Sequence, residues 1–321
     1  MTDAATTQLA IETHGLTKMF GKQTAVNGID LAVPRGSVFG FLGPNGSGKT
    51  TTIRVLLGLA SATSGDVSVL GQPLPGRLPQ VLPHVGALIE GPGFYPFLSG
   101  TANLMRLDTA DRFVTGATRR KRVEQALERV GLTHAAAKKV KAYSLGMKQR
   151  LGIANALLTP RDLIVLDEPT NGLDPQGTRE VRNLVRSLTA EGTTVFVSSH
   201  LLAEIEQMCT HAAVMRAGSL VAQGSLDDLR RAGQTRVRVL TRDDLAAENV
   251  LRSIGLMPDH RESAGDGVVA LTAPLPDDRQ PDAIVAALVA GGVRVRGFSV
   301  EGSTLEDLFV ALTGEGFDVV Q

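Results

Sequence analysis

The chain is predicted to have an α/β fold followed by a smaller α+β domain, and three observations support this prediction. From residue 9 to about 224, apolar runs typical of strands alternate with runs of helical spacing. Several strand-like runs are short and continuously apolar, as expected for strands that are buried on both faces of a parallel sheet. After residue 225 the alternation restarts on a smaller scale. We therefore expect two domains, at 9–224 and 225–321.

In the first domain, the clearest predicted strands are 38–42, 163–166 and 194–198. Between residues 101 and 158 no strand signal occurs, and residues 122–130 show helical spacing that ends at Gly131. This pattern predicts a helical subdomain at about 98–158. Two segments rich in proline and glycine are expected to be loops, 71–83 and 91–96.

In the second domain, the predicted strands are 235–241, 267–272 and 293–300. Helices are expected at 244–254 and 282–290, with a closing helix at 304–312.

Composition limits the classes of function. The 321-residue chain has 33 basic (Lys and Arg) and 33 acidic residues, so no bulk field attracts nucleic acid or anionic lipid, and no nucleic-acid partner is expected. The basic run at 119–122 adjoins a helical stretch and is interpreted as a solvated face. No run of about 18 apolar residues occurs, and the first residues lack a signal-peptide pattern. We therefore expect a chain that neither carries a secretory signal nor spans a membrane by itself.

Cys209 is the only cysteine, which excludes an internal disulfide and fits a reducing compartment. It is expected to be a small buried side chain.

The most informative segment is a glycine-rich loop that ends in Lys-Thr. Its candidate phosphate-binding residues are Gly43, Pro44, Asn45, Gly46, Ser47, Gly48, Lys49, Thr50 and Thr51. Glycines let successive backbone N–H groups point at phosphate oxygens, Lys49 adds a positive charge, and the Thr50 hydroxyl can bind Mg²⁺. The alternative is an ordinary turn. A strand before the loop and a helix after it favour the phosphate site.

A second motif completes this site. Residues 163–169 form an apolar strand that ends in Asp167 and Glu168. Because burial of lone carboxylates is costly, two of them at a strand end imply a cation or a polar cleft. Asp167 is expected to hold Mg²⁺ and Glu168 to act as general base towards water. A polar turn without function is the alternative.

Residues 143–151 read YSLGMKQRL. In this segment the chain resembles an ATP-binding-cassette (ABC) ATPase. Residues 143–147 are similar to the family's signature sequence, which opens a helix and caps the nucleotide held by the other subunit. The resemblance assigns Ser144 and Gly146 to that contact. Read from the residues alone, Ser144 is a helix N-cap.

Three further resemblances stand at the expected places along the chain. Asn171-Gly172-Leu173-Asp174 resembles the D-loop, in which Asp174 would couple the sites of the two subunits. His200 follows a strand, as does the family's histidine that contacts the γ-phosphate. Phe20 stands at the place of the aromatic residue that stacks on adenine. A capping histidine and a core phenylalanine are the alternatives.

The chain departs from the family at the glutamine that lies near Mg²⁺, where it has Glu90. A carboxylate can bind Mg²⁺ but cannot donate a hydrogen bond as an amide does. Glu90 and residues 143–147 together resemble the corresponding segments of ATPases in exporters that give self-protection against bacitracin and lantibiotics, and in related drug exporters.

The resemblance implies a P-loop ABC ATPase domain with a mixed sheet and a helical subdomain, which binds ATP and Mg²⁺. It implies a homodimer of ATPase domains around two ATP molecules that drives an integral membrane permease from the cytoplasmic face of the membrane. Two alternatives remain open, a soluble ATPase of the same superfamily acting on DNA or ribosomes, and a non-catalytic ATP-dependent switch or sensor.

Overall fold

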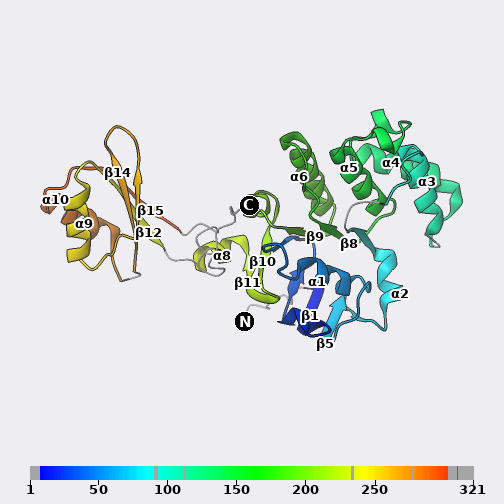
Figure 1. Cartoon of the computed structure of the whole chain (residues 1–321), viewed down its shortest axis with the longest axis horizontal. Helices are drawn as coiled ribbons and strands as arrows, with labels where there is room; N and C mark the ends of the chain where they lie inside the picture. Colours follow the sequence, from blue (N-terminus) through cyan, green and yellow to red (C-terminus); the bar gives the residue numbers. More distant parts are fainter. Residues whose placement is uncertain are drawn as a thin grey trace, which may run out of the picture. The chain divides into compact units, whose positions relative to one another are not determined.

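The structure, a computed structural model, describes residues 8–89, 93–111, 113–232, 235–276, 278–302 and 309. The chain divides into two compact units, Met1–Leu226 and Asp227–Gln321. Figure 1 shows helices and strands in both, and each unit encloses a hydrophobic core of its own.

A six-stranded sheet forms the centre of the first unit. Its strand order is β11 (Ser219–Ser225), β10 (His211–Arg216), β4 (Val38–Leu42), β9 (Thr194–Ser199), β8 (Leu163–Asp167) and β7 (Val85–Leu88). Pairing is parallel from β10 to β7, and only β11 is antiparallel to its neighbour. Every residue of β4, β8 and β9 is buried, which explains why these strands are continuously apolar.

A second, antiparallel sheet lies at the N-terminus of the first unit. It contains β1 (Leu9–Phe20), β2 (Gln23–Ile29), β3 (Ala32–Pro34), β5 (Ser64–Val69) and β6 (Gln72–Leu74). Helix α1 (Lys49–Leu56) contacts strands of both sheets, and one core joins them. In that core Phe196 stacks on Phe39 at 5.8 Å between ring centroids and contacts Phe41 at 5.3 Å.

The first unit also contains further helices, most of which lie on the side of β8 and β9 that faces away from β1 and β5 (Figure 1). Their bounds are α2 (Leu78–Val81), α3 (Gly100–Ala110), α4 (Arg119–Arg129), α5 (Leu145–Ala156), α6 (Pro175–Ala190) and α7 (Leu202–Met208), with 3₁₀ turns at Leu82–His84, Gly116–Thr118, Thr133–Ala135 and Val140–Ala142. The segment from α3 to α5, here called the helical arm, contains no extended strand among its described residues, as the sequence predicted.

Two predictions for the first unit need correction. The segment 71–83 is not only a loop, because it contains β6 and α2. The basic run at 119–122 is not wholly a solvated face. Arg119 and Arg122 donate hydrogen bonds to the buried carboxylate of Asp108. Burial alone would raise the pKa of Asp108, but the two guanidinium groups lower it below its usual value.

Cys209 is buried, as predicted, and burial raises the pKa of its thiol.

The second unit has the order β-α-β-β-α-β, with a four-stranded antiparallel sheet in the order β13-β14-β12-β15. Its elements are β12 (Arg236–Thr241), α9 (Asp244–Ser253), β13 (His260–Ser263), β14 (Val269–Pro274), α10 (Pro281–Ala290) and β15 (Val295–Glu301); α8 (Leu226–Ala232) begins at the boundary between the units. Strand β13 was not predicted, because all four of its residues are exposed and lack an apolar pattern. The predicted helix at 304–312 lies, apart from residue 309, outside the described residues.

Within the part of the chain that the structure describes, no helix is both long and apolar enough to cross a bilayer.

Replacing Phe196 with alanine should lower the free energy of unfolding by about 3–5 kcal/mol, since it removes a fully buried ring from the joint core. Chemical denaturation of the full chain measures this change. Phe20→Ala serves as control, because 51% of Phe20 is exposed, and it should leave stability nearly unchanged. Equal effects of the two substitutions would show that the core is placed wrongly.

Candidate functional site

The glycine-rich loop connects the C-terminal end of β4 to the first turn of α1. Gly46 and Gly48 have φ angles of 81° and 104°, which glycine adopts without strain. A Cβ on Gly48 would lie 2.5 Å from the carbonyl oxygen of Ala25, so no larger residue fits there. Helix α1 begins directly at Lys49, and its free N–H groups and positive dipole end face the loop. This geometry is suited to binding phosphate.

Lys49 is buried within the loop. Its ammonium group donates hydrogen bonds to the carbonyl oxygens of Gly43 at 2.6 Å and Pro44 at 3.3 Å, and lies 3.5 Å from a carboxylate oxygen of Glu168. Burial lowers the pKa of Lys49, while the nearby carboxylates of Glu168 and Asp167 act against this shift. The ammonium group of Lys49 is thus held at the phosphate loop.

Asp167 and Thr50 are adjacent although they are far apart in the sequence. The Thr50 hydroxyl donates a hydrogen bond to Asp167 Oδ2 at 3.0 Å. A hydroxyl and a carboxylate oxygen are ligands that Mg²⁺ accepts, and this ion usually takes its remaining ligands from phosphate and water. The pair therefore fits a magnesium ion that a phosphate ligand also coordinates.

Glu168 lies between the other charged groups of the site. One carboxylate oxygen faces Lys49, and the other is 2.8 Å from Nδ1 of His200. The backbone of Glu168 has a φ of 48°, a left-handed conformation that costs about 1–3 kcal/mol for a non-glycine residue. Such strain at a charged residue is typical of functional sites.

A cavity of about 490 Å³ joins the loop to Glu168 and to the end of β1. Its lining includes Phe20 and residues 45–51. Phe20 is half exposed and is therefore not a core residue, so its ring is available to stack on a flat ligand. Lys18 lies over the same ring, 4.8 Å from the centroid.

The structure does not bring Ser144, Gly146 and Asp174 into this cavity. Ser144 caps α5 by accepting a hydrogen bond from the backbone N–H of Met147, and Asp174 caps α6 by accepting one from Gly177. Gly146 packs near Leu173, because a Cβ on it would lie 3.3 Å from that side chain. The signature segment and the D-loop segment are thus neighbours, outside the cavity that the phosphate loop lines. Glu90 lies outside the described residues.

Sequence reasoning missed two residues that contact Glu168. The hydroxyl of Ser198 accepts a hydrogen bond from the Glu168 N–H, and the side chain of Gln149 donates one to the Glu168 carbonyl. A serine among the apolar residues of a buried strand was the available signal for Ser198. Gln149 gave none, since a glutamine on a helix is usually solvated.

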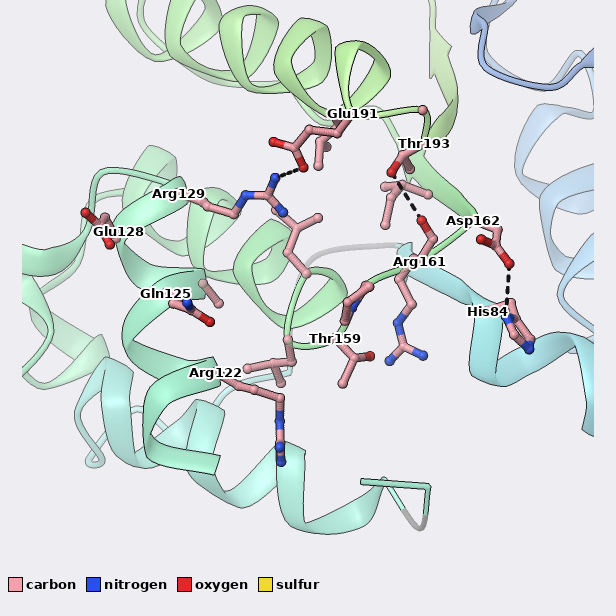
Figure 2. A pocket seen from close by; sticks show the side chains of 17 residues that line it. His84, Arg122, Gln125, Glu128, Arg129, Thr159, Arg161, Asp162, Glu191 and Thr193 are labelled. Carbon is pink, nitrogen blue, oxygen red and sulfur yellow. Dashed lines mark hydrogen bonds and ion pairs between the residues drawn. The ribbon is translucent and has the colours of Figure 1, made fainter. Parts of the chain in front are cut away.

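A larger cavity, of about 880 Å³, lies next to the N-terminal ends of β7, β8 and β9, where Figure 2 shows its charged side chains. Four of these side chains are paired with one another, Arg129 with Glu191 and His84 with Asp162. None of the residues predicted for phosphate binding lines it. Because the phosphate loop follows the C-terminal end of β4, the smaller cavity is the candidate site.

Sequence comparison places this arrangement among known proteins. The family model described as ABC transporter matches residues 26–171. The chain is 39% identical to the bacitracin transport ATP-binding protein BcrA of Bacillus licheniformis, over 95% of this chain and 98% of that protein. It is 36% identical to the daunorubicin/doxorubicin resistance ATP-binding protein DrrA of Streptomyces peucetius, over 96% and 94% of the two chains.

Structure comparison agrees. A solved ATP-binding subunit of an ABC transporter is similar with a TM-score of 0.62 and 29% identity, over 70% of this chain and 92% of that one. The ADP conformation of the ATP-binding cassette MJ1267 is similar with the same TM-score and 26% identity, over 69% and 93%.

Replacing Lys49 with alanine should weaken binding of Mg·ATP by about 10- to 100-fold, because a charge-assisted hydrogen bond to phosphate is lost. Isothermal titration of the full chain measures the affinity, and Lys121→Ala, an exposed lysine on α4, is the matched control. Unchanged affinity in a folded Lys49→Ala chain would contradict the assignment of the loop.

Proposed function

Because this chain belongs to the ABC transporter family of ATPases, we propose that its ATP hydrolysis drives a separate membrane permease that exports a drug or peptide antibiotic. The observation that carries the proposal is the similarity to BcrA and DrrA, whose names refer to bacitracin transport and to daunorubicin resistance. In both cases similarity extends over at least 95% of the chain and therefore includes the second unit.

The proposed mechanism assigns one role to each residue of the candidate site. The loop N–H groups and Lys49 bind the phosphates of ATP, and Phe20 stacks on the adenine. Glu168, next to His200, accepts a proton from the attacking water. Thr50 and Asp167 would hold Mg²⁺, which would supply positive charge towards the phosphates; the role of Glu90 at the metal rests on the family resemblance alone. His200 contacts the γ-phosphate.

We propose that a second copy of the chain completes each site. Ser144, Gly146 and Asp174 lie outside the cavity of their own chain, and the adjacent Leu145 is 58% exposed. A helix N-terminus capped by serine is suited to a phosphate group that arrives from another subunit. This supports a homodimer around two ATP molecules, on the cytoplasmic face of the membrane, where the permease holds it.

Residues 225–321 are proposed to be an accessory domain that regulates the ATPase or helps it to dimerise. Every phosphate-site motif ends by His200, whereas the later segment has its own core. Leu226 remains attached to the first unit, since its N–H donates to the carbonyl of Thr210 and its side chain is buried. A shortened chain should therefore end at residue 226 and not at 224.

Export is tested in a drug-sensitive bacterium that expresses the chain together with the membrane protein that co-purifies with it. We expect resistance to bacitracin or daunorubicin to rise several-fold. In Glu168→Gln resistance should be lost and turnover should fall by roughly 100-fold or more, because the general base is removed, while ATP still binds. ATP hydrolysis without resistance to any compound would overturn the export assignment alone; near-normal turnover in Glu168→Gln would overturn the role of Glu168.

The accessory role is tested with a chain of residues 1–226. It should fold and bind Mg·ATP with unchanged affinity, because an appended domain can be removed without unfolding its neighbour. Dimerisation, or stimulation of turnover by the permease, should decrease. Loss of ATP binding in a folded shortened chain would show instead that the second unit contributes to the nucleotide site.

A further inference from the structure

The left-handed turn at Glu168 is held by two side chains from different parts of the fold. Its N–H donates to Ser198 Oγ at 2.9 Å, and its carbonyl accepts hydrogen bonds from Gln149 Nε2 at 3.3 Å and from the backbone N–H of Asn171 at 3.2 Å. Both peptide groups that flank the strained φ angle therefore have side-chain partners. A non-glycine residue keeps a left-handed backbone conformation only when its surroundings enforce it.

Ser198 is fully buried on β9. Its hydroxyl donates to Asp167 Oδ1 at 2.5 Å and accepts from the Glu168 N–H. A serine hydroxyl has a single proton to donate, and Ser198 donates it to Asp167, the carboxylate proposed to bind metal. The same oxygen thus fixes the metal-side carboxylate and the peptide of the proposed base.

Gln149 belongs to the helical arm. It is 8% exposed and lies on α5, the helix that Ser144 caps. The start of this helix packs tightly on the D-loop segment, because a Cβ on Gly172 would lie 2.6 Å from a methyl group of Leu145. A shift of α5 would therefore reach the Glu168 carbonyl through Gln149.

We propose that Ser198 and Gln149 are positioning residues that hold Glu168 in its left-handed conformation, with its carboxylate between Lys49 and His200. Ser198 fixes the turn from the central sheet. Gln149 fixes it from the helical arm, and so makes the orientation of the base depend on where the arm lies. The inference rests on the proposed role of Glu168 as general base.

The test is steady-state ATP hydrolysis by the full-length chain with its permease. Ser198→Ala should lower kcat by roughly 10- to 100-fold, with ATP affinity unchanged within about threefold, because the base is displaced while the phosphate loop is intact. Ser198→Thr keeps the hydroxyl and should recover most of kcat. Thr194→Val is the matched control, because it removes another buried hydroxyl from β9 that bonds to Gly36 and not to the site.

Gln149→Met, which keeps the length of the side chain, should also lower kcat without weakening ATP binding. Since both residues act on the backbone of one residue, Glu168, the effects of Ser198→Ala and Gln149→Met on ln kcat should be less than additive when the substitutions are combined. If one of the two single variants folds poorly, the other still tests the inference, because each removes a different contact to the backbone of Glu168.

Glu168→Gln distinguishes the proposed role of Glu168 as general base from the positioning role of Ser198 and Gln149. If Glu168→Gln abolishes turnover but Ser198→Ala and Gln149→Met each stay within twofold of the unmodified chain, the positioning inference is wrong and the base assignment stands. If Glu168→Gln itself keeps turnover, the proposed role of Glu168 fails first. Equal loss of kcat in Thr194→Val would also overturn the inference, since that loss would reflect general damage to β9.

Discussion

Parallel pairing of β4, β8 and β9 is the constraint on which the whole site depends. In this register Leu42 pairs with Ser199, and Asp167 pairs with Ser198, so the three strands end at one edge of the sheet. The phosphate loop follows β4, Asp167 and Glu168 stand at the end of β8, and His200 follows β9. Groups more than 100 residues apart in sequence therefore meet at one edge of the sheet, as is general at the carboxyl ends of α/β sheets.

Charge balance is the second condition for this site. Two carboxylates and one buried ammonium group meet at the sheet edge, and each would be costly to bury alone. Hydrogen bonds from Thr50 and Ser198 to Asp167, and contacts of Glu168 with Lys49 and His200, offset this cost. The network also maintains the strained turn at Glu168 and fixes the charged groups relative to one another.

Features that are marked by contiguous residues could be predicted from the sequence, whereas contacts between distant residues could not. The strands at 38–42, 163–166 and 194–198 were found nearly to the residue, because complete burial leaves an uninterrupted apolar run. The exposed β13 left no pattern, and β6 and α2 were hidden by prolines and glycines. In the site, the glycine loop and Asp167-Glu168 are contiguous motifs. The contacts of Ser198 and Gln149 arise only from tertiary packing, as does the pairing of Arg119 and Arg122 with Asp108.

The central claim is that the carboxyl edge of the parallel sheet holds the phosphates of ATP. A crystal structure of the full-length chain with Mg²⁺ and a non-hydrolysable ATP analogue tests it most directly. We expect phosphate oxygens within hydrogen-bonding distance of the loop N–H groups and of Lys49 Nζ, and the metal bound to Thr50 and Asp167. Nucleotide bound instead in the 880 Å³ cavity at the opposite ends of the strands, with the loop free of phosphate, would contradict the claim.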